Sequence, residues 1–325
     1  MPISPWMAAV REKVGHDLVV TVGVSAIVYN DDKTQILLQR RSDNGKWGVP
    51  GGGIEPGEHP AEAAVRETYE ETGMRVEVTD LVGVFGGKEQ IKAYPNGDRF
   101  AYIAISFACR VVGGTIDPDP DETLEARWWD VDALPTNFSE VHHRRLDAWR
   151  AGKIPAFPVP EPIVPIETRS NYIREIRDKV GTLMLLSPGA TMLIFNDAGE
   201  VLVQRRTDDG LWNFPGGAYE PGEEIAETAI REAYEETGLL IKPVRLVGVY
   251  GGEDYIHTYA NGETMAYINV VFVCKIAGGT LQKDSESSAL RFVAPDALPE
   301  PFTDKHRELI VHAMTRDADE PYFVR

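Results

Sequence analysis

Three glutamates recur at the same spacing in the two halves of this sequence. They are Glu67, Glu70 and Glu71 in the first half and, 165 residues later, Glu232, Glu235 and Glu236. On a helix, positions i, i+3 and i+4 project from one face, so each triad would gather three carboxylates. Like charges that lie so close repel each other unless a cation binds beside them, and a hard divalent ion prefers oxygen ligands. The spacing therefore predicts a metal site in each half.

Each triad lies in a longer frame of glycines, an arginine and a further acid. The frame holds Gly52, Glu58, Arg66 and Gly73 in the first half and Gly217, Glu223, Arg231 and Gly238 in the second. We expect Arg66 and Arg231 to keep neighbouring carboxylates ionised and oriented. Glycines before the helix allow a backbone carbonyl to turn toward the ion, and Gly51 and Gly216 are the candidates for this ligand. A lone acidic triplet is usually a solvated helix face, but a complete frame present twice argues against that interpretation.

The frame resembles the Nudix box, Gly-x5-Glu-x7-Arg-Glu-U-x-Glu-Glu-x-Gly-U, where U is a bulky aliphatic residue. Both copies match every charged and glycine position and depart from the pattern at Thr68 and Ala233, where the first U is expected. The resemblance implies an α/β (α+β) chain of two tandem Nudix folds, each an α/β/α sandwich around a mixed β-sheet. It also implies hydrolysis of a nucleoside diphosphate linked to another moiety, with Mg²⁺ or Mn²⁺ as cofactor. The box residues expected to act in catalysis are Glu70, Glu71, Arg66, Glu235, Glu236 and Arg231.

The repeat extends far beyond the two boxes. Residues 6–15 match 172–181, each a predicted short helix that a glycine ends, and the Asn96-Gly97 turn matches Asn261-Gly262. Five prolines between residues 154 and 166 favour an extended strap rather than a folded element. We therefore expect a first domain at 1–153, a proline-rich linker at 154–166 and a second domain at 167–325.

The composition indicates a protein that acts on small molecules. The 325 residues carry 51 acids and 33 bases, and a formal charge of −18 repels a nucleic-acid polymer. A small polyphosphate remains compatible, because bound metal ions reverse the local charge. No run of 18 apolar residues and no charged-then-apolar leader is present, so we expect neither a membrane span nor a signal peptide. Cys109 and Cys274 lie in apolar strands and are expected to be buried thiols, which suits a reducing cytoplasm.

Residues outside the boxes are candidates for the rest of each site. Glu122 and Glu286 precede the last strand of each half, where related Nudix enzymes often carry a further metal ligand or the base for water. The alternative for a lone glutamate is an exposed loop acid. Strand-end arginines are candidates to hold substrate phosphate, with solvated charges as the alternative, and four aromatic residues are candidates to stack on a base. The arginines are Arg40, Arg41, Arg205 and Arg206, and the aromatic residues are Phe85, Tyr94, Tyr250 and Tyr259.

Two alternatives to a pair of catalytic halves stay open. One is a nucleotide sensor without activity, against which stand the intact box glutamates and an acidic charge unsuited to DNA. The other is one catalytic half beside a structural or nucleotide-sensing half. The candidate substrates are nucleoside triphosphates including oxidised ones, dinucleoside polyphosphates and ADP-ribose-like compounds. We expect the halves to pack about a pseudo-twofold axis as an intramolecular pseudo-dimer, which allows the chain to act as a monomer.

Overall fold

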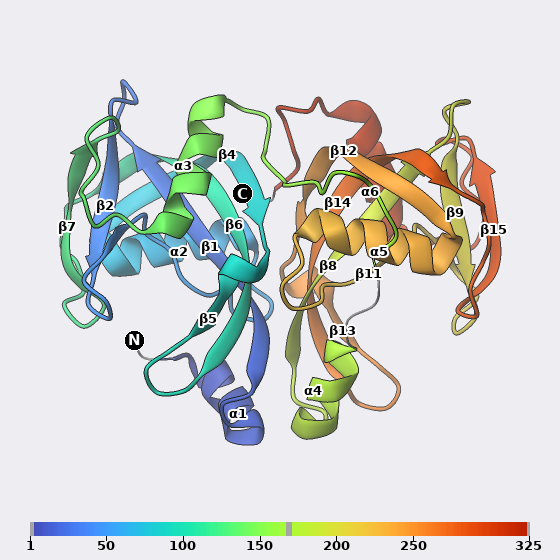
Figure 1. Cartoon of the computed structure of the whole chain (residues 1–325), viewed down its shortest axis with the longest axis horizontal. Helices are drawn as coiled ribbons and strands as arrows, with labels where there is room; N and C mark the ends of the chain where they lie inside the picture. The colour runs from blue at the N-terminus through green and yellow to red at the C-terminus, as the bar shows by residue number, and fades with distance from the viewer. Residues whose placement is uncertain (1–2, 167–170, 324–325) are drawn as a thin grey trace.

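The two halves of the chain fold into similar units that lie side by side (Figure 1). The computed structural model describes residues 3–166 and 171–323. The first half contains α1 (Pro5–Val14), β1 (Leu18–Tyr29), β2 (Gln35–Arg41), β3 (Trp47–Gly48), α2 (Pro60–Thr72), β4 (Met74–Phe85), η1 (Lys88–Gln90), β5 (Ile91–Ala93), β6 (Arg99–Gly114), β7 (Thr123–Asp130) and α3 (Glu140–Ala151). The second half contains α4 (Tyr172–Val180), β8 (Leu185–Phe195), β9 (Val201–Arg206), β10 (Trp212–Asn213), β11 (Gly216–Ala218), α5 (Ile225–Thr237), β12 (Leu239–Tyr250), η2 (Glu253–Tyr255), β13 (Ile256–Thr258), β14 (Thr264–Gly279), β15 (Ser287–Val293) and α6 (Asp304–Thr315).

Each half is built on a mixed β-sheet. The strand order is β3-β2-β1-β6-β4 in the first half and β10-β9-β8-β14-β12 in the second. The central strands run parallel, β1 beside β6 and β8 beside β14, while β4 and β12 pair antiparallel with them. This arrangement confirms the mixed sheet that the sequence predicts.

Helices cover both faces of each sheet. Along β2, Ile36 and Leu38 belong to the apolar cluster that contains Leu146 of α3, whereas Leu37 belongs to the cluster that contains Ala64 of α2. Because alternate residues of a strand point to opposite faces, α2 and α3 lie on opposite sides of the sheet. The α/β/α sandwich is therefore confirmed.

The box helix α2 is set by signals at both of its ends. His59 and Glu62 form a capping box at its start, with Pro60 in the first turn, where no backbone donor is needed. Gly73 ends the helix at φ 75, a left-handed conformation that strains other residues. Helix α5 has an equivalent capping box and glycine stop. The glutamate triads therefore project from regular helices, as the spacing predicts.

The halves dock through reciprocal contacts. The side chain of Ile256 lies over Gly57 of the first half, and the side chain of Ile91 lies over Gly222 of the second half. Strand β1 lies against β8 and α1 lies against α4. Such reciprocity is the signature of an isologous interface, here formed within one chain.

The proline-rich linker and the C-terminal tail cover equivalent sheet edges. Ala156 pairs with Gly83 beside β4, and Tyr322 pairs with Gly248 beside β12. Residues 154–166 contain no helix or strand of their own, as expected for an extended strap. Both segments cap strands whose hydrogen-bonding groups would otherwise be open to other chains.

The residues that follow these two bridges cross to the other half. The ring of Phe157 lies 5.1 Å from that of Phe272, and the ring of Phe323 lies 5.8 Å from that of Phe107. One apolar cluster contains buried residues of both halves. The linker therefore binds the halves together as well as connecting them.

The buried strands β6 and β14 carry the two cysteines. Cys109 and Cys274 are both buried thiols, as predicted. Among the helices that the structure describes, none combines the length and the hydropathy that a bilayer span requires.

Candidate active site

Arg66 is the centre of the carboxylate cluster in the first half. It donates to both oxygens of Glu58 at 2.7 and 2.8 Å, to Glu67 at 2.7 Å and to Glu70 at 3.0 Å. It also donates to the Gly53 carbonyl at 3.0 Å, which ties α2 to the loop before it. The planar fork of a guanidinium suits such paired acceptors. The arginine therefore orients the first two glutamates of the triad, as predicted.

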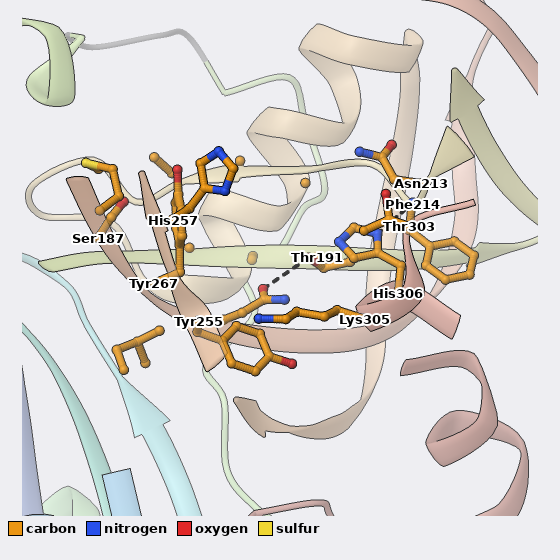
Figure 2. A pocket seen from close by; sticks show the side chains of 18 of the residues that line it. Ser187, Thr191, Asn213, Phe214, Tyr255, His257, Tyr267, Thr303, Lys305 and His306 are labelled. Atoms are coloured by element: carbon orange, nitrogen blue, oxygen red, sulfur yellow. Dashed lines mark hydrogen bonds between the residues drawn. The ribbon is translucent and has the colours of Figure 1, made fainter. Parts of the chain in front are cut away.

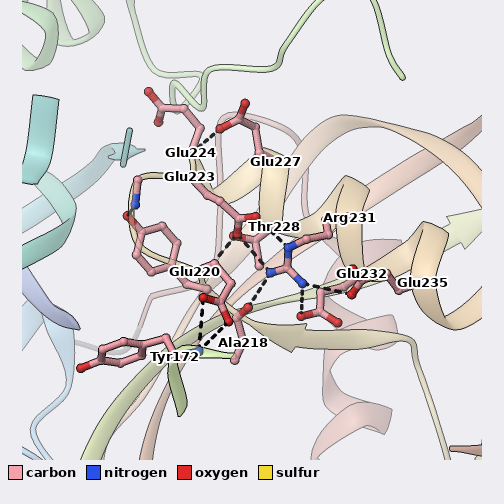
Figure 3. Close-up of polar contacts among 12 residues, drawn as sticks. Tyr172, Ala218, Glu220, Glu223, Glu224, Glu227, Thr228, Arg231, Glu232 and Glu235 are labelled. Carbon is pink, nitrogen blue, oxygen red and sulfur yellow. Dashed lines mark hydrogen bonds and ion pairs between the residues drawn. The ribbon is translucent and has the colours of Figure 1, made fainter. Parts of the chain in front are cut away.

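Arg231 repeats these contacts in the second half (Figure 3). Its hydrogen bonds go to Glu223 (2.7 and 3.1 Å), Glu232 (2.7 Å), Glu235 (3.3 Å) and the Ala218 carbonyl (2.8 Å). The Arg231 side chain is only 3% exposed, whereas that of Arg66 is 32% exposed. The same set of contacts is thus built twice, in surroundings of different polarity.

The third glutamate of each triad turns away from the arginine and toward the glycine loop. Glu71 accepts hydrogen bonds from the Gln39 amide at 2.5 Å and from the Gly51 N–H at 2.6 Å. Glu236 accepts from the Gly216 N–H at 3.0 Å. The predicted metal-binding glycines therefore lie against the triads, near the start of the segment that leads to each box helix.

Burial raises the pKa of carboxylates in both triads. It is the largest cause of the shift, and it raises the pKa of Glu67 to about 7 and that of Glu71 to about 8 against the opposing effect of their hydrogen bonds. In the second half, burial raises the pKa of Glu232, and it raises that of Glu236 to about 8. Carboxylates that ionise with difficulty gain most from a cation bound beside them.

The first glycine of each box leaves room only for the carboxylate beside it. A Cβ added at Gly52 would lie 2.3 Å from a Glu67 oxygen, and one added at Gly217 would lie 2.1 Å from the Glu232 carboxyl carbon. A larger residue at either position would displace the glutamate from the loop. The glycine is thus required by a close approach of side chain to backbone.

The donors in each half fit a hard divalent cation. Three carboxylates and a glycine loop supply only oxygen ligands, the set that Mg²⁺ and Mn²⁺ favour. Within residues 3–166 and 171–323, no three His, Cys, Asp or Glu side chains already converge as a metal cluster. The reason lies in the contacts above, because the arginine holds the first two glutamates and the third turns to the loop. Glu70 and Glu235 are the most exposed members of their triads.

A cavity of about 860 Å³ opens beside the second-half box (Figure 2). Its wall includes the box carboxylates Glu232 and Glu236 together with the glycine loop. Aromatic and polar side chains complete the lining, among them Phe214, Tyr255, His257, Tyr267, Asn213 and Lys305. The cavity can therefore hold a planar ring next to an anion bound through metal ions.

Two predicted residues outside the box line this cavity, Arg206 and Glu286. The Arg206 guanidinium pairs with Asp208 at 2.5 Å. Arg205 is its neighbour in β9 and points to the other face, where it donates to the Gly210 carbonyl at 3.0 Å. Only one arginine of this pair is thus positioned to meet a ligand in the cavity.

Two of the four aromatic predictions are overturned by burial. Tyr250 stacks on Tyr322 at 4.7 Å and on His312 at 5.9 Å, and its hydroxyl lies 2.9 Å from the His312 ring. Phe85 is also buried, with the Arg144 guanidinium 5.7 Å from its ring centre. Neither ring is open to a base, because each packs under the closing helix of its half.

The other predicted residues have identifiable partners. Arg40 lies 3.8 Å from Glu125, Arg41 donates to Asp43 at 3.0 Å, Tyr94 lies 3.0 Å from the Tyr102 hydroxyl, and the hydroxyl of the exposed Tyr259 meets that of Tyr267. Partial burial first, and then neighbouring charges that include Asp119 and Glu70, raise the pKa of Glu122.

Sequence reasoning missed two histidines under the glycine loops. Nδ1 of His142 accepts from the Val49 N–H at 2.9 Å, and Nδ1 of His306 accepts from the Phe214 N–H at 3.0 Å. Burial lowers the pKa of both rings, to about 4 for His306, so they are neutral supports of the loop. Their shared place, third in α3 and third in α6, was the only signal in the sequence.

The sequence also matches a known family model. The NUDIX domain matches residues 19–149 and 185–313, which together make up most of the chain. The chain belongs to the Nudix family. Each matched region contains one complete box and the sheet that supports it, so the tandem Nudix fold is confirmed.

Individual Nudix relatives each match about one half of this chain. A MutT-like protein of Streptomyces ambofaciens is 36% identical over 126 residues, which are 39% of this chain and 74% of that protein. An ADP-ribose pyrophosphatase of Methanocaldococcus jannaschii is 38% identical over 117 residues, 35% of this chain and 64% of that protein. The crystal structure of a MutT Nudix hydrolase from Burkholderia pseudomallei has 26% identity and a TM-score of 0.34, and covers 40% of this chain and 97% of that one. By family and relatives, the chain is a Nudix pyrophosphohydrolase.

Proposed function

We propose that each half hydrolyses the diphosphate linkage of a nucleoside diphosphate linked to another moiety. The observation that carries this proposal is the arginine-centred carboxylate cluster, which recurs contact for contact in both halves. The candidate substrates are nucleoside triphosphates including oxidised ones, dinucleoside polyphosphates and ADP-ribose-like compounds. The relative named as an ADP-ribose pyrophosphatase supports keeping the last class in this set.

The metal ligands we propose are the triad glutamates and one glycine carbonyl in each half. They are Glu67, Glu70, Glu71 and Gly51 in the first half, and Glu232, Glu235, Glu236 and Gly216 in the second. Mg²⁺ or Mn²⁺ bound there supplies neutralisation of the diphosphate and polarisation of the phosphorus that water attacks. Arg66 and Arg231 position carboxylates and do not touch the substrate. Glu122 and Glu286 are our candidates to accept the proton of the attacking water.

We propose the domain boundaries 1–153, 154–166 and 167–325 and an intramolecular pseudo-dimer that works as a monomer in the reducing cytoplasm. The reciprocal docking contacts and the two buried thiols support this arrangement. The second candidate is one catalytic half beside a structural or nucleotide-sensing half. The difference in burial between Arg66 and Arg231 is the observation that favours it.

The test inactivates each half separately and measures turnover of the candidate substrates. Glu70→Gln and Glu235→Gln each keep the size of the side chain and remove a ligand charge, so each should reduce turnover by its own half about 100-fold. All turnover should disappear in excess chelator and return with Mg²⁺ or Mn²⁺. Glu77→Gln, an exposed glutamate paired with Arg110, is the matched control.

Two outcomes would change the proposal. Near wild-type turnover by the double variant would show that the triads are not the catalytic centre. If one single variant abolished all activity and the other abolished none, only the half that carries the inactivating substitution would be catalytic.

A further inference from the structure

A buried arginine of the first half has no partner within the described chain. Arg145 on α3 is 7% exposed, and its Nε is shielded from solvent. Among residues 3–166 and 171–323 its guanidinium makes no hydrogen bond and no ion pair. A buried charge without a partner costs several kcal/mol. Burial and, after it, the neighbouring Arg144 charge lower the pKa of Arg145 to about 10, so it still carries its charge at neutral pH.

The position of Arg145 corresponds to a residue that lines the second-half cavity. His142 and His306 anchor α3 and α6 in the same way, each accepting a backbone N–H of the glycine loop. Three residues after each histidine stand Arg145 in the first half and Leu309 in the second. Leu309 lines the cavity beside the second-half box. By this correspondence we infer that Arg145 faces a first-half cleft equivalent to the second-half cavity.

A second cation of the first half, Lys92, stands where the second half has a histidine of the cavity lining. His257 lines the second-half cavity, and Lys92 is its counterpart, since the two occupy the same register position in β13 and β5. Lys92 donates to the Glu89 carbonyl at 2.7 Å, and burial first, then the Arg145 charge, lower its pKa. The nearby Glu89 is engaged by Arg144 and only partly offsets this repulsion.

The third cation of the cleft is common to both halves. Arg206 lines the second-half cavity, and Arg41 takes its place at the end of β2. Arg41 donates to Asp43 at 3.0 Å, and its charge also contributes to lowering the pKa of the buried His142. Three cations of the first half thus take the places of Arg206, His257 and Leu309, whereas Lys305 of the second-half cavity corresponds to Val141.

We propose that Arg145, Lys92 and Arg41 form an anion subsite in the first-half cleft, which binds a phosphoryl group of the substrate separate from the diphosphate that is cut. The inference rests on the proposed function, because it places the substrate's diphosphate at the first box. A guanidinium binds phosphate through two parallel hydrogen bonds, and a dianion would offset the charge of Arg145, which has no partner among the described residues. In the second half Leu309 and His257 take the places of Arg145 and Lys92, and the cations that line the cavity are Arg206 and Lys305.

The first arm of the test compares two substrates that differ by one phosphate. NADPH and NADH are suitable probes, since NADPH carries an additional phosphate monoester remote from the diphosphate. The full chain with Glu235→Gln reports the first half alone, and Arg145→Leu installs the residue that the second half uses. The ratio of kcat/KM for NADPH to that for NADH should fall 10- to 100-fold, the loss expected for one charge-assisted hydrogen bond. An unchanged ratio would refute the proposal that the phosphoryl group bound at this subsite belongs to the substrate.

The second arm measures binding without turnover. Inorganic phosphate is titrated calorimetrically into the full chain in chelator at constant ionic strength, and Arg145→Leu should weaken its binding at least 10-fold. Arg110→Leu, an exposed arginine, is the control. Equal phosphate affinity in wild type and Arg145→Leu would overturn the subsite, whatever the turnover.

The two arms separate the subsite from the proposed function. Phosphate binding that depends on Arg145 in a protein that cuts no diphosphate substrate would support the subsite and overturn the proposed function. Thermal unfolding adds an independent readout, since removal of an unpaired buried charge should leave the Tm equal or higher. A lower Tm together with unchanged phosphate affinity would assign Arg145 a purely structural role and overturn the subsite.

Discussion

The two box sites share their contacts but differ in how far water reaches them. The side chains of Arg231 and Glu223 are 3% and 1% exposed, whereas those of Arg66 and Glu58 are 32% and 16% exposed. The charge-assisted hydrogen bonds have the same partners and nearly the same lengths in both halves. The strength of these interactions therefore differs through the surrounding dielectric rather than through the contacts.

The difference in burial comes from residues that lie between the box positions. Thr228 stands where the first half has Ala63, and its hydroxyl donates to Glu223 at 2.8 Å. Tyr219 replaces Ile54, and its hydroxyl accepts from the Gly222 N–H at 3.1 Å. Duplicated sites can thus diverge in stability and substrate while every charged residue of the frame is retained.

The largest expected effect on stability concerns Arg231, the buried arginine of the second box. Arg231→Gln would leave Glu223 buried without its cation, and we expect a loss of about 3–5 kcal/mol in the free energy of unfolding. Arg66→Gln should cost about 1 kcal/mol, because water reaches this cluster and screens it. Urea unfolding at pH 7.5 would measure both values. Equal losses would contradict a difference in polarity between the two sites.

A smaller effect is expected at acidic pH. It tests whether His306 and His142 stabilise the two halves in the same way. The pKa of His306 is about 4 in the folded protein and about 6.5 when unfolded, so its neutral form stabilises the fold above pH 6.5. This contribution falls as the pH falls toward 4, by about 1.4 kcal/mol between pH 7.5 and pH 5.5. Unfolding free energies at these two pH values should depend less on pH in His306→Gln than in wild type. His142→Gln should reduce the dependence similarly, and an unchanged dependence in both would refute the assignment.

The smallest effect on stability concerns the interface between the halves. The Tyr172 hydroxyl of the second half accepts from the Val20 N–H of the first half at 2.7 Å. Tyr172→Phe removes this acceptor and should cost about 1–2 kcal/mol, because the N–H stays buried. Tyr94→Phe, which removes a half-buried hydroxyl bonded within the first half, should cost less than about 0.5 kcal/mol. Urea unfolding of both variants checks the ranking, and a reversed order would show that the interface contact contributes little.

Much of the site could be predicted because its determinants are local. The glutamate spacing set one face of α2, and Pro60 and Gly73 marked its ends. Arg66 is one to four residues from two of its partners, so helix geometry alone brings them together. The mixed sheet followed only from the resemblance to the Nudix box. The alternation of apolar and polar residues within a strand does not specify which strands are neighbours or whether they run parallel.

The predictions failed where a contact depended on packing between distant segments. Tyr250 and Phe85 are aromatic residues of the kind that stacks on a base, but both are buried and packed under the closing helix of their half. Gln39 meets Glu71 across 32 residues, and nothing in its neighbourhood marks it as a partner of the box. Aromatic and amide side chains take either role, so only their final burial decides between them.

The sequence by itself determined the two boxes, their helices and the chemistry of their oxygen donors, because periodicity and capping act within a few residues. The tertiary structure alone decided which box is shielded from water and that Arg145 is buried with no partner among the described residues. Arg145 and Leu309 occupy equivalent helix positions, and only the packing of α3 and α6 against the glycine loops buries an arginine in one half and places a leucine in the cavity lining of the other. Burial is a property of the whole packed chain, and it sets both the cost of a charge and its need for a partner.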